Sequence, residues 1–275
     1  MRFYLSTMAD ILMDESGDEP VTTYDRPYTA PVAKRYGLGL ELAEFCLPDN
    51  LDRDFARTDK TVRGKIPGFS DLIVHAPYNE LSPCSIDRRV MEVTTLRYEQ
   101  CYAIAQGYGA KKLVVHSGYV PNVYHPVWFV ARSVSFWREF LEKHPGDMVV
   151  CLENVMETEP DALLEVVEQV DSPRLRLTFD VGHARVTAGQ RGAGAETVFA
   201  WLERCAPAIS HFHIHNNAGL RDTHDPLDKG SMDMEALLRR AAELCPGASF
   251  TVECMEAERC AAWLKEKGFT GAQAS

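Results

Sequence analysis

The feature that most constrains this chain is a regular alternation of short apolar segments with longer segments of helical periodicity. The strand-like segments are RFYLS (2–6), GLELAEF (39–45), DLIVHAP (71–77), KKLVVHSG (111–118), DMVVCLEN (147–154), RLRLTFDVGH (174–183), AISHFHIHNN (208–217) and SFTVEC (249–254). Strands that alternate with helices run parallel, and eight of them favour a closed barrel over an open sheet. We therefore expect an α/β protein with a (β/α)8 barrel fold, formed as a single domain by residues 1–275.

The segments between the strands have apolar residues at three- and four-residue spacing, which predicts amphipathic helices. These helices are expected at residues 88–109, 126–144, 161–170, 194–205, 232–245 and 257–268. Residues 8–34 are instead rich in Asp, Glu, Pro and Thr and lack this periodicity, so we expect a long loop after the first strand. In a barrel such a loop lies on the active-site face.

Composition excludes several classes of protein. The net charge of -11 repels a polyanion, so we expect no nucleic-acid partner. No segment has the apolar run of a signal peptide or of a membrane span, which predicts a cytoplasmic protein without a membrane partner. The eight cysteines contain no C-x-x-C pair, so disulfides and cysteine-based zinc sites are not expected.

Metal-competent side chains recur where the predicted strands end. They are His75, His116, Glu153, Asp180, His213 and Glu253. A lone residue of this kind is most simply a helix cap or a hydrogen-bonding partner, but that explanation gives no reason for recurrence in unit after unit. Because a barrel brings these strand ends to one face, we expect one site there. Imidazole and carboxylate ligands suit zinc, manganese or iron.

Two further pieces follow the later strands. His183 lies three residues after Asp180, and Asp222 and His224 form a D-T-H step in the loop after the seventh strand. His211, His213 and His215 alternate, so they face the same side of their strand. Asp225 and Asp228 crowd the D-T-H step and are either substitute ligands or outer support.

These motifs together resemble those of a known superfamily. HAPY (75–78), VVHSG (114–118), LEN (152–154), FDVGH (179–183), HIHNN (213–217), DTH (222–224) and VEC (252–254) are similar to the motif series of the xylose isomerase-like barrels. That superfamily includes endonuclease IV and the sugar-phosphate isomerases and epimerases. The resemblance runs from about the second strand to the end of the chain.

The endonuclease IV pattern implies two or three divalent metal ions, zinc, manganese or iron. One ion would bind His75, His116 and Glu153, and a second would bind Glu153, Asp180, His213 and Glu253, with Glu153 between them. A third would bind His183, Asp222 and His224. The motif favours His213 as the ligand on its strand, with His215 as the alternative. Tyr78, Asn79, Asn154 and His215 are predicted to contact the substrate.

The resemblance leaves the reaction open between a hydrolase and an isomerase. The third ion favours a phosphoester hydrolase acting on a small sugar phosphate, in which clustered metals activate water. The alternative is a sugar or sugar-phosphate isomerase or epimerase, with Glu153 and Glu253 as the catalytic acid/base pair. Repair endonuclease activity is disfavoured because this chain has N-N-A-G and D-T-H where DNA-cleaving members have N-D-S-K and D-R-H. A non-catalytic binding protein fits the intact ligand series least well. The oligomeric state stays open.

Overall fold

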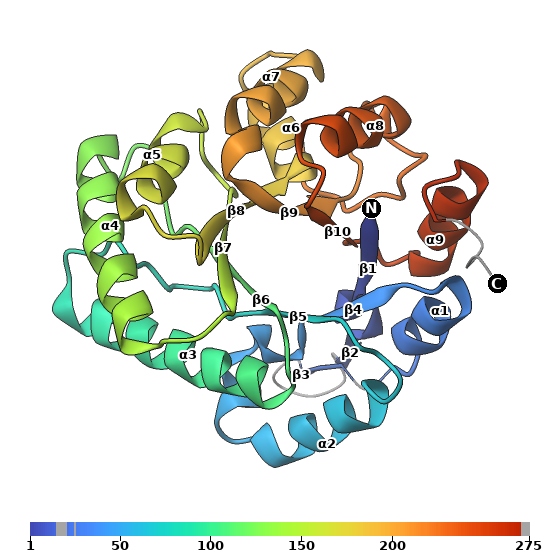
Figure 1. Cartoon of the computed structure of the whole chain (residues 1–275), viewed down its shortest axis with the longest axis horizontal. Coiled ribbons are helices and arrows are strands. Elements are labelled where there is room, and N and C mark those ends of the chain that lie inside the picture. The colour runs from blue at the N-terminus through green and yellow to red at the C-terminus, as the bar shows by residue number, and fades with distance from the viewer. Residues whose placement is uncertain (15–20, 25, 271–275) are drawn as a thin grey trace.

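The fold is a closed barrel of eight parallel strands surrounded by helices (Figure 1). The computed structural model describes residues 1–14, 21–24 and 26–270. Around the barrel the strands follow the order β1-β10-β9-β8-β7-β6-β5-β4. They are β1 (Arg2–Ser6), β4 (Gly39–Leu42), β5 (Leu72–His75), β6 (Lys112–His116), β7 (Val149–Glu153), β8 (Leu175–Asp180), β9 (Ile209–Ile214) and β10 (Ser249–Val252). The predicted (β/α)8 barrel is confirmed, and each predicted strand is present.

The helices form the outer ring in Figure 1. They are α1 (Thr29–Tyr36), α2 (Phe55–Lys65), α3 (Arg88–Gly107), α4 (Pro126–Lys143), α5 (Asp161–Val170), α6 (Val181–Gln190), α7 (Glu196–Cys205), α8 (Met234–Leu244) and α9 (Ala257–Glu266). The sequence pattern missed α1, α2 and α6. Helix α6 begins directly after β8. The last residue of β8, Asp180, is the N-cap of this helix, and its carboxylate accepts a hydrogen bond from His183 N.

The segment expected to be a long loop is partly regular. A 3₁₀ helix (Thr7–Asp10) follows β1, and β2 (Leu12–Asp14) pairs antiparallel with β3 (Val21–Thr23). Helix α1 then begins at Thr29, whose backbone N–H and hydroxyl both donate to Asp10 Oδ1. Lys65 forms an ion pair with the same carboxylate at 2.7 Å. The expectation of an irregular loop is therefore wrong for α1, which tertiary contacts stabilise despite weak periodicity.

The strands divide their side chains between two environments. One set, which includes Leu5, Leu40 and Val74, joins the large core beneath the helices. The alternating set points into the barrel, where Tyr4, Ile73, Val114 and Cys151 form a separate small cluster. Nearer the strand ends, the interior positions are filled by buried polar side chains, and these positions form the candidate site.

Two other expectations concern cysteines and membranes. The eight cysteines lie within the described residues, and all are buried free thiols, as expected. Among the described helices, none has the length and hydropathy to cross a bilayer.

Gly39 is expected to tolerate no side chain. A Cβ atom at this position would lie 2.4 Å from Cδ1 of the Tyr4 ring, which is fixed inside the barrel. We expect Gly39→Ala to lower the free energy of unfolding by about 1–3 kcal/mol, the usual cost of overpacking a core. Gly64→Ala on α2 is the matched control, because a Cβ there meets nothing within 4 Å, and it should not destabilise the protein. Urea denaturation compares the two, and equal midpoints would contradict the prediction.

Candidate metal centre and active site

The barrel brings the predicted ligands to the carboxyl ends of its strands. The last residues of β5, β6, β7 and β8 are His75, His116, Glu153 and Asp180. His213 lies near the end of β9, and Glu253 directly follows β10. Parallel strands end at one face, so side chains far apart in the chain share one buried cluster.

Glu153 is the centre of this cluster. Its Oε2 lies 3.2 Å from His75 Nε2, 3.6 Å from His116 Nε2 and 3.4 Å from His213 Nδ1. Its other oxygen, Oε1, lies 3.2 Å from His183 Nδ1. The ring nitrogens near Oε2 belong to the ligand sets of both ions that the resemblance assigns to Glu153, and its bridging role remains a prediction.

His213 faces three carboxylates with one ring nitrogen. Its Nδ1 lies 3.4 Å from both Glu153 Oε2 and Glu253 Oε2, and 3.8 Å from Asp180 Oδ2. Its Nε2 lies 2.9 Å from Glu41 Oε1 on β4. An ionised carboxylate can only accept, so Nε2–H donates to Glu41 and the lone pair of Nδ1 points at the other carboxylates.

Two other histidines of the site have the same arrangement, in which one ring nitrogen donates a hydrogen bond and the other faces a carboxylate. Nδ1 of His75 donates to Ala76 O at 2.8 Å, and Nδ1 of His183 donates to Asn154 O at 3.0 Å. Each backbone carbonyl fixes the tautomer in which Nε2 carries a lone pair, although that nitrogen also faces a carboxylate. This is how metal-binding histidines are oriented by outer partners.

Several atoms at the centre lack partners. In the described part of the chain, Asp180 Oδ2 and His213 Nδ1 are buried without a hydrogen bond. Buried polar atoms of this kind are costly unless something satisfies them. A divalent cation would satisfy the lone pairs and the carboxylates together, so the residues present fit the metal ions that the resemblance implies.

The ligand-type residues fall into groups whose ligand atoms lie within 4.8 Å of one another. Three overlapping groups share Glu153 or His213, and together they are called the first groups. They are His75, His116 and Glu153; Glu153, Asp180 and His213; and Glu41, His75, His213 and Glu253. The second group comprises His183, His215, Asp222 and His224. All nine residues predicted as ligands occur in these groups, and their metal-binding roles remain predictions. Glu41 and His215 are additions.

The loop that carries Asp222 and His224 is tied to the barrel. Asn216 and Asp225 exchange backbone hydrogen bonds of 3.0 and 2.9 Å across an isolated β-bridge. His224 has a φ of +45°, a conformation that is strained for a residue with a side chain. Its Nδ1 donates to Glu253 O at 2.9 Å, which directs Nε2 to Asp222 Oδ2 at 3.0 Å.

The two buried glutamates differ in their electrostatic environment. Burial favours the neutral form of Glu153, but the nearby His213 and His116 outweigh burial and hold its pKa well below the usual range. Burial and the charge of Glu153 raise the pKa of Glu253 despite the opposing effect of His213. Carboxyl groups whose pKa values are pushed apart are suited to opposite roles in proton transfer.

The residues predicted to contact the substrate differ in how far they are exposed. Tyr78 stacks on His116 with ring centroids 4.2 Å apart and is 38% exposed, so its face is available to a ligand. Asn79 is exposed beside it. Asn154 is buried, and its amide group bonds to the backbone N and O of Asp180 at 2.9 Å each. Asn154 thus aligns β7 with β8, and its contact with substrate remains a prediction.

Asp225 and Asp228 were alternatives as ligands. Asp225 pairs with Lys229 at 2.6 Å, and Asp228 pairs with Arg259 at 2.9 Å. Neither belongs to a ligand group found among the described residues. The structure therefore favours the interpretation that they support the loop.

Sequence reasoning missed Glu41. This fully buried side chain contacts His213, His211 at 3.0 Å and Thr251 at 2.5 Å. The hydrogen-bonded chain continues from His211 Nδ1 to Ser249 Oγ at 2.7 Å and on to Lys112. One signal was available, because an acidic residue interrupts the apolar strand GLEL at a position that a barrel turns inward.

His211 predicts a pH dependence of stability. Burial lowers its pKa from 6.5 to about 4, so the folded protein takes up this proton only at lower pH than the unfolded chain. The stability that neutral His211 contributes is therefore present above pH 6.5 and is lost as the pH falls toward 4. The shift corresponds to about 3 kcal/mol.

We expect His211→Gln in metal-free protein to flatten the loss of stability across this interval. Urea denaturation at a series of pH values measures the effect. His125→Gln, at an exposed position, is the control and should keep the parent slope. An unchanged slope in His211→Gln would show that another group controls the acid response.

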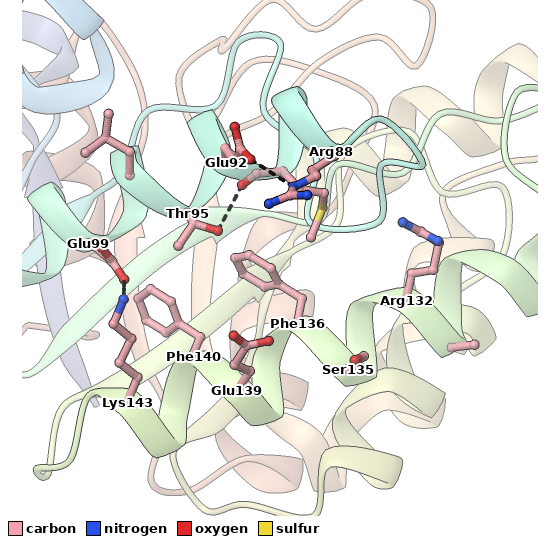
Figure 2. A pocket seen from close by; sticks show the side chains of 13 residues that line it. Arg88, Glu92, Thr95, Glu99, Arg132, Ser135, Phe136, Glu139, Phe140 and Lys143 are labelled. Atoms are coloured by element: carbon pink, nitrogen blue, oxygen red, sulfur yellow. Dashed lines mark hydrogen bonds and ion pairs between the residues drawn. The ribbon is translucent and has the colours of Figure 1, made fainter.

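A separate groove of about 730 Å³ lies on the outer wall between α3 and α4 (Figure 2). Phe136 and Phe140 of α4 face it, and the ion pair between Glu99 and Lys143 crosses one end. None of the candidate ligands lines it. The groove is therefore distinct from the site at the strand ends.

Comparison with known proteins agrees with this architecture. The sequence model of the family described as "Xylose isomerase-like TIM barrel" matches residues 33–269. The MJ1311 protein of Methanocaldococcus jannaschii is 30% identical over 183 residues, which are 63% of this chain and 61% of that protein. This chain therefore matches less than two thirds of that relative's length.

Two solved structures extend the comparison. A D-tagatose 3-epimerase-like protein has a TM-score of 0.71 and 22% identity, with 97% of each chain covered. The TTHB071 protein of Thermus thermophilus, from a crystal soaked with ZnCl2, has a TM-score of 0.67 and 25% identity, with 99% of each chain covered.

Proposed function

We propose that this chain, which belongs to the xylose isomerase-like TIM barrel family, is a divalent-metal-dependent isomerase or epimerase of a small sugar or sugar phosphate. One observation carries the proposal. Glu153 from β7 and Glu253 after β10 both lie 3.4 Å from His213 Nδ1. Two glutamates from well-separated strands thus flank one position, as a proton transfer between the two faces of a substrate carbon requires.

In this proposal each residue has a defined task. One glutamate removes the proton from the carbon beside the substrate carbonyl, and the other returns a proton to the opposite face. A bound divalent ion would supply polarisation of the carbonyl and hydroxyl oxygens. Asp180 and His213 would hold that ion and leave positions for the substrate oxygens, the glutamates would be available to move the proton, and Tyr78 would offer its exposed ring to the sugar. The name of the D-tagatose 3-epimerase-like neighbour agrees with this chemistry.

The test is exchange of a carbon-bound hydrogen. Protein purified without chelators is supplied with Mn²⁺ or Zn²⁺ and incubated in D₂O with a panel of free and phosphorylated ketoses and aldoses. We expect NMR to show metal-dependent deuterium uptake at the carbon beside the carbonyl, together with the epimer or isomer. Absence of exchange across the panel, with the metal bound, would overturn the proposal.

Phosphoester hydrolysis is the second candidate. It is favoured by the overlapping ligand groups that share Glu153, because more than one cation held there could activate water and bind a phosphoryl group. Release of inorganic phosphate from sugar phosphates, without deuterium uptake, would favour hydrolysis over proton transfer.

A further inference from the structure

The second ligand group contains one side chain more than the triad that the resemblance implies. We propose that His215 is a fourth protein ligand of a divalent cation held by His183, Asp222 and His224. With four protein ligands this site is closed, so its cation offers no position to substrate. The inference does not depend on which reaction the first groups perform.

Three imidazole nitrogens converge on the carboxylate of Asp222. Nε2 of His183 and Nε2 of His224 lie 3.1 and 3.0 Å from Oδ2. Nε2 of His215 lies 3.7 Å from Oδ1. The ligand atoms of the four residues lie within 4.8 Å of one another, and zinc ligands at bond lengths of roughly 2.0–2.2 Å have comparable separations.

The hydrogen bonds made by the ring nitrogens that face away from Asp222 limit how the Nε2 atoms can be protonated. His183 and His224 use Nδ1 to donate to Asn154 O and Glu253 O, which are acceptors only. Their Nε2 atoms then meet a carboxylate, which is also an acceptor. Either both rings are doubly protonated around one oxygen, or a cation lies between the nitrogens and Asp222. The second arrangement matches the way outer carbonyls orient metal-binding histidines.

His215 supplies the independent observation. Its side chain is fully buried, and in the part of the chain that the structure describes neither ring nitrogen makes a hydrogen bond, although Nε2 lies 3.3 Å from Asp180 Oδ1. Leaving both nitrogens of a buried imidazole unsatisfied is costly, so the site lacks a group that binds there. The ring is also held in place, since it stacks on His224 with centroids 3.9 Å apart.

Gly182 makes room for this ring. A Cβ atom at residue 182 would lie 1.9 Å from His215 Cε1, so any larger residue would displace the imidazole. The ring therefore occupies a space that the start of α6 leaves open for it, against the other members of the second group.

The number of ligands determines what the cation can do. Zinc sites with four protein ligands are structural, whereas catalytic sites keep one position for water or substrate. Three imidazoles and one carboxylate suit zinc and related divalent ions. A closed second site would fix the Asp222 loop against α6 and the end of β9, and hydrolysis would have to rely on ions of the first groups.

The experiment uses Co²⁺ as the probe, because four-coordinate Co²⁺ absorbs visible light far more strongly than six-coordinate Co²⁺. Metal-free full chain is titrated with Co²⁺, bound ions are counted by elemental analysis after dialysis, and the spectrum is recorded with and without inorganic phosphate. The variants are His215→Asn and Asp222→Asn, with His125→Asn as an exposed control. Circular dichroism checks that each is folded.

We expect the difference spectrum between the parent and Asp222→Asn, which isolates this ion, to show an intense four-coordinate band that phosphate does not change. His215→Asn should weaken the binding of one ion by at least the roughly 10–100-fold that loss of an outer partner costs, and should remove this band. Asp222→Asn should lose the same ion, and the control should match the parent.

Three results would overturn the proposal. Unchanged affinity and spectrum in His215→Asn would show that His215 is not a ligand. Equal numbers of ions in the parent and Asp222→Asn would show that no cation binds there. If His215→Asn does not fold, a band in the same difference spectrum that is absent or shifts with phosphate would show that the site is open. None of these readouts involves catalysis, so failure of the proposed isomerase activity is seen separately in the exchange assay.

Discussion

Glu153→Gln and Glu253→Gln are each expected to lower the rate of sugar epimerisation by roughly 10²–10⁴-fold, the usual contribution of a positioned acid or base. With two bases, each variant loses one proton transfer and keeps the other. Each should therefore still exchange hydrogen for deuterium in one epimer only, and the two variants should retain opposite epimers. NMR of both epimers in D₂O measures this pattern.

Metal content separates proton transfer from metal binding in these variants. Glu139→Gln, at an exposed position on α4, is the matched control and should keep full activity. If both glutamine variants lose their metal and all exchange together, the glutamates act as ligands alone, and the two-base mechanism is wrong.

Glu41→Gln is expected to weaken metal binding at the first groups by about 10–100-fold, although Glu41 lies on the far side of His213 from the other carboxylates. The Glu41 carboxylate accepts the Nε2 proton of His213 at 2.9 Å and so directs the Nδ1 lone pair to Glu153, Asp180 and Glu253. A neutral amide can point its NH₂ group at Nε2 instead and favour the other tautomer. Calorimetric titration with Zn²⁺ measures the affinity.

Glu44→Gln is the control for Glu41→Gln. Glu44 is equally buried, and it pairs with Lys65 at 2.8 Å and accepts from Thr7, but it contacts none of the predicted ligands. Both variants are expected to lower stability, since each weakens a buried charged network. If both lower zinc affinity by the same factor, the effect reflects general loosening of the barrel rather than orientation of His213.

The sequence pattern alone was sufficient to predict the elements whose pattern recurs along the chain. The strands were predicted because each is a short apolar run and most are followed by a segment of helical periodicity, and that order also dictates parallel pairing and right-handed crossovers. Helix α1 was missed because its apolar residues are few, and it is stabilised by Asp10 contacts with Thr29 and Lys65. Helix α6 was missed because its buried residues surround it too evenly to give an amphipathic pattern.

The sequence by itself determined the barrel and most of the candidate ligands, because metal-competent residues that recur at the ends of six of the eight predicted strands are visible without knowing any contact. Only the tertiary structure decided which residues of the site touch. Glu41 meets His211 and His213 across 170 and 172 residues of chain, and that contact exists only when β4 and β9 face one another across the closed barrel. The tertiary structure also decided which residues surround His215. Alternation puts it on the same side of β9 as His213, but closure of the barrel and the space at Gly182 bring it to the second group.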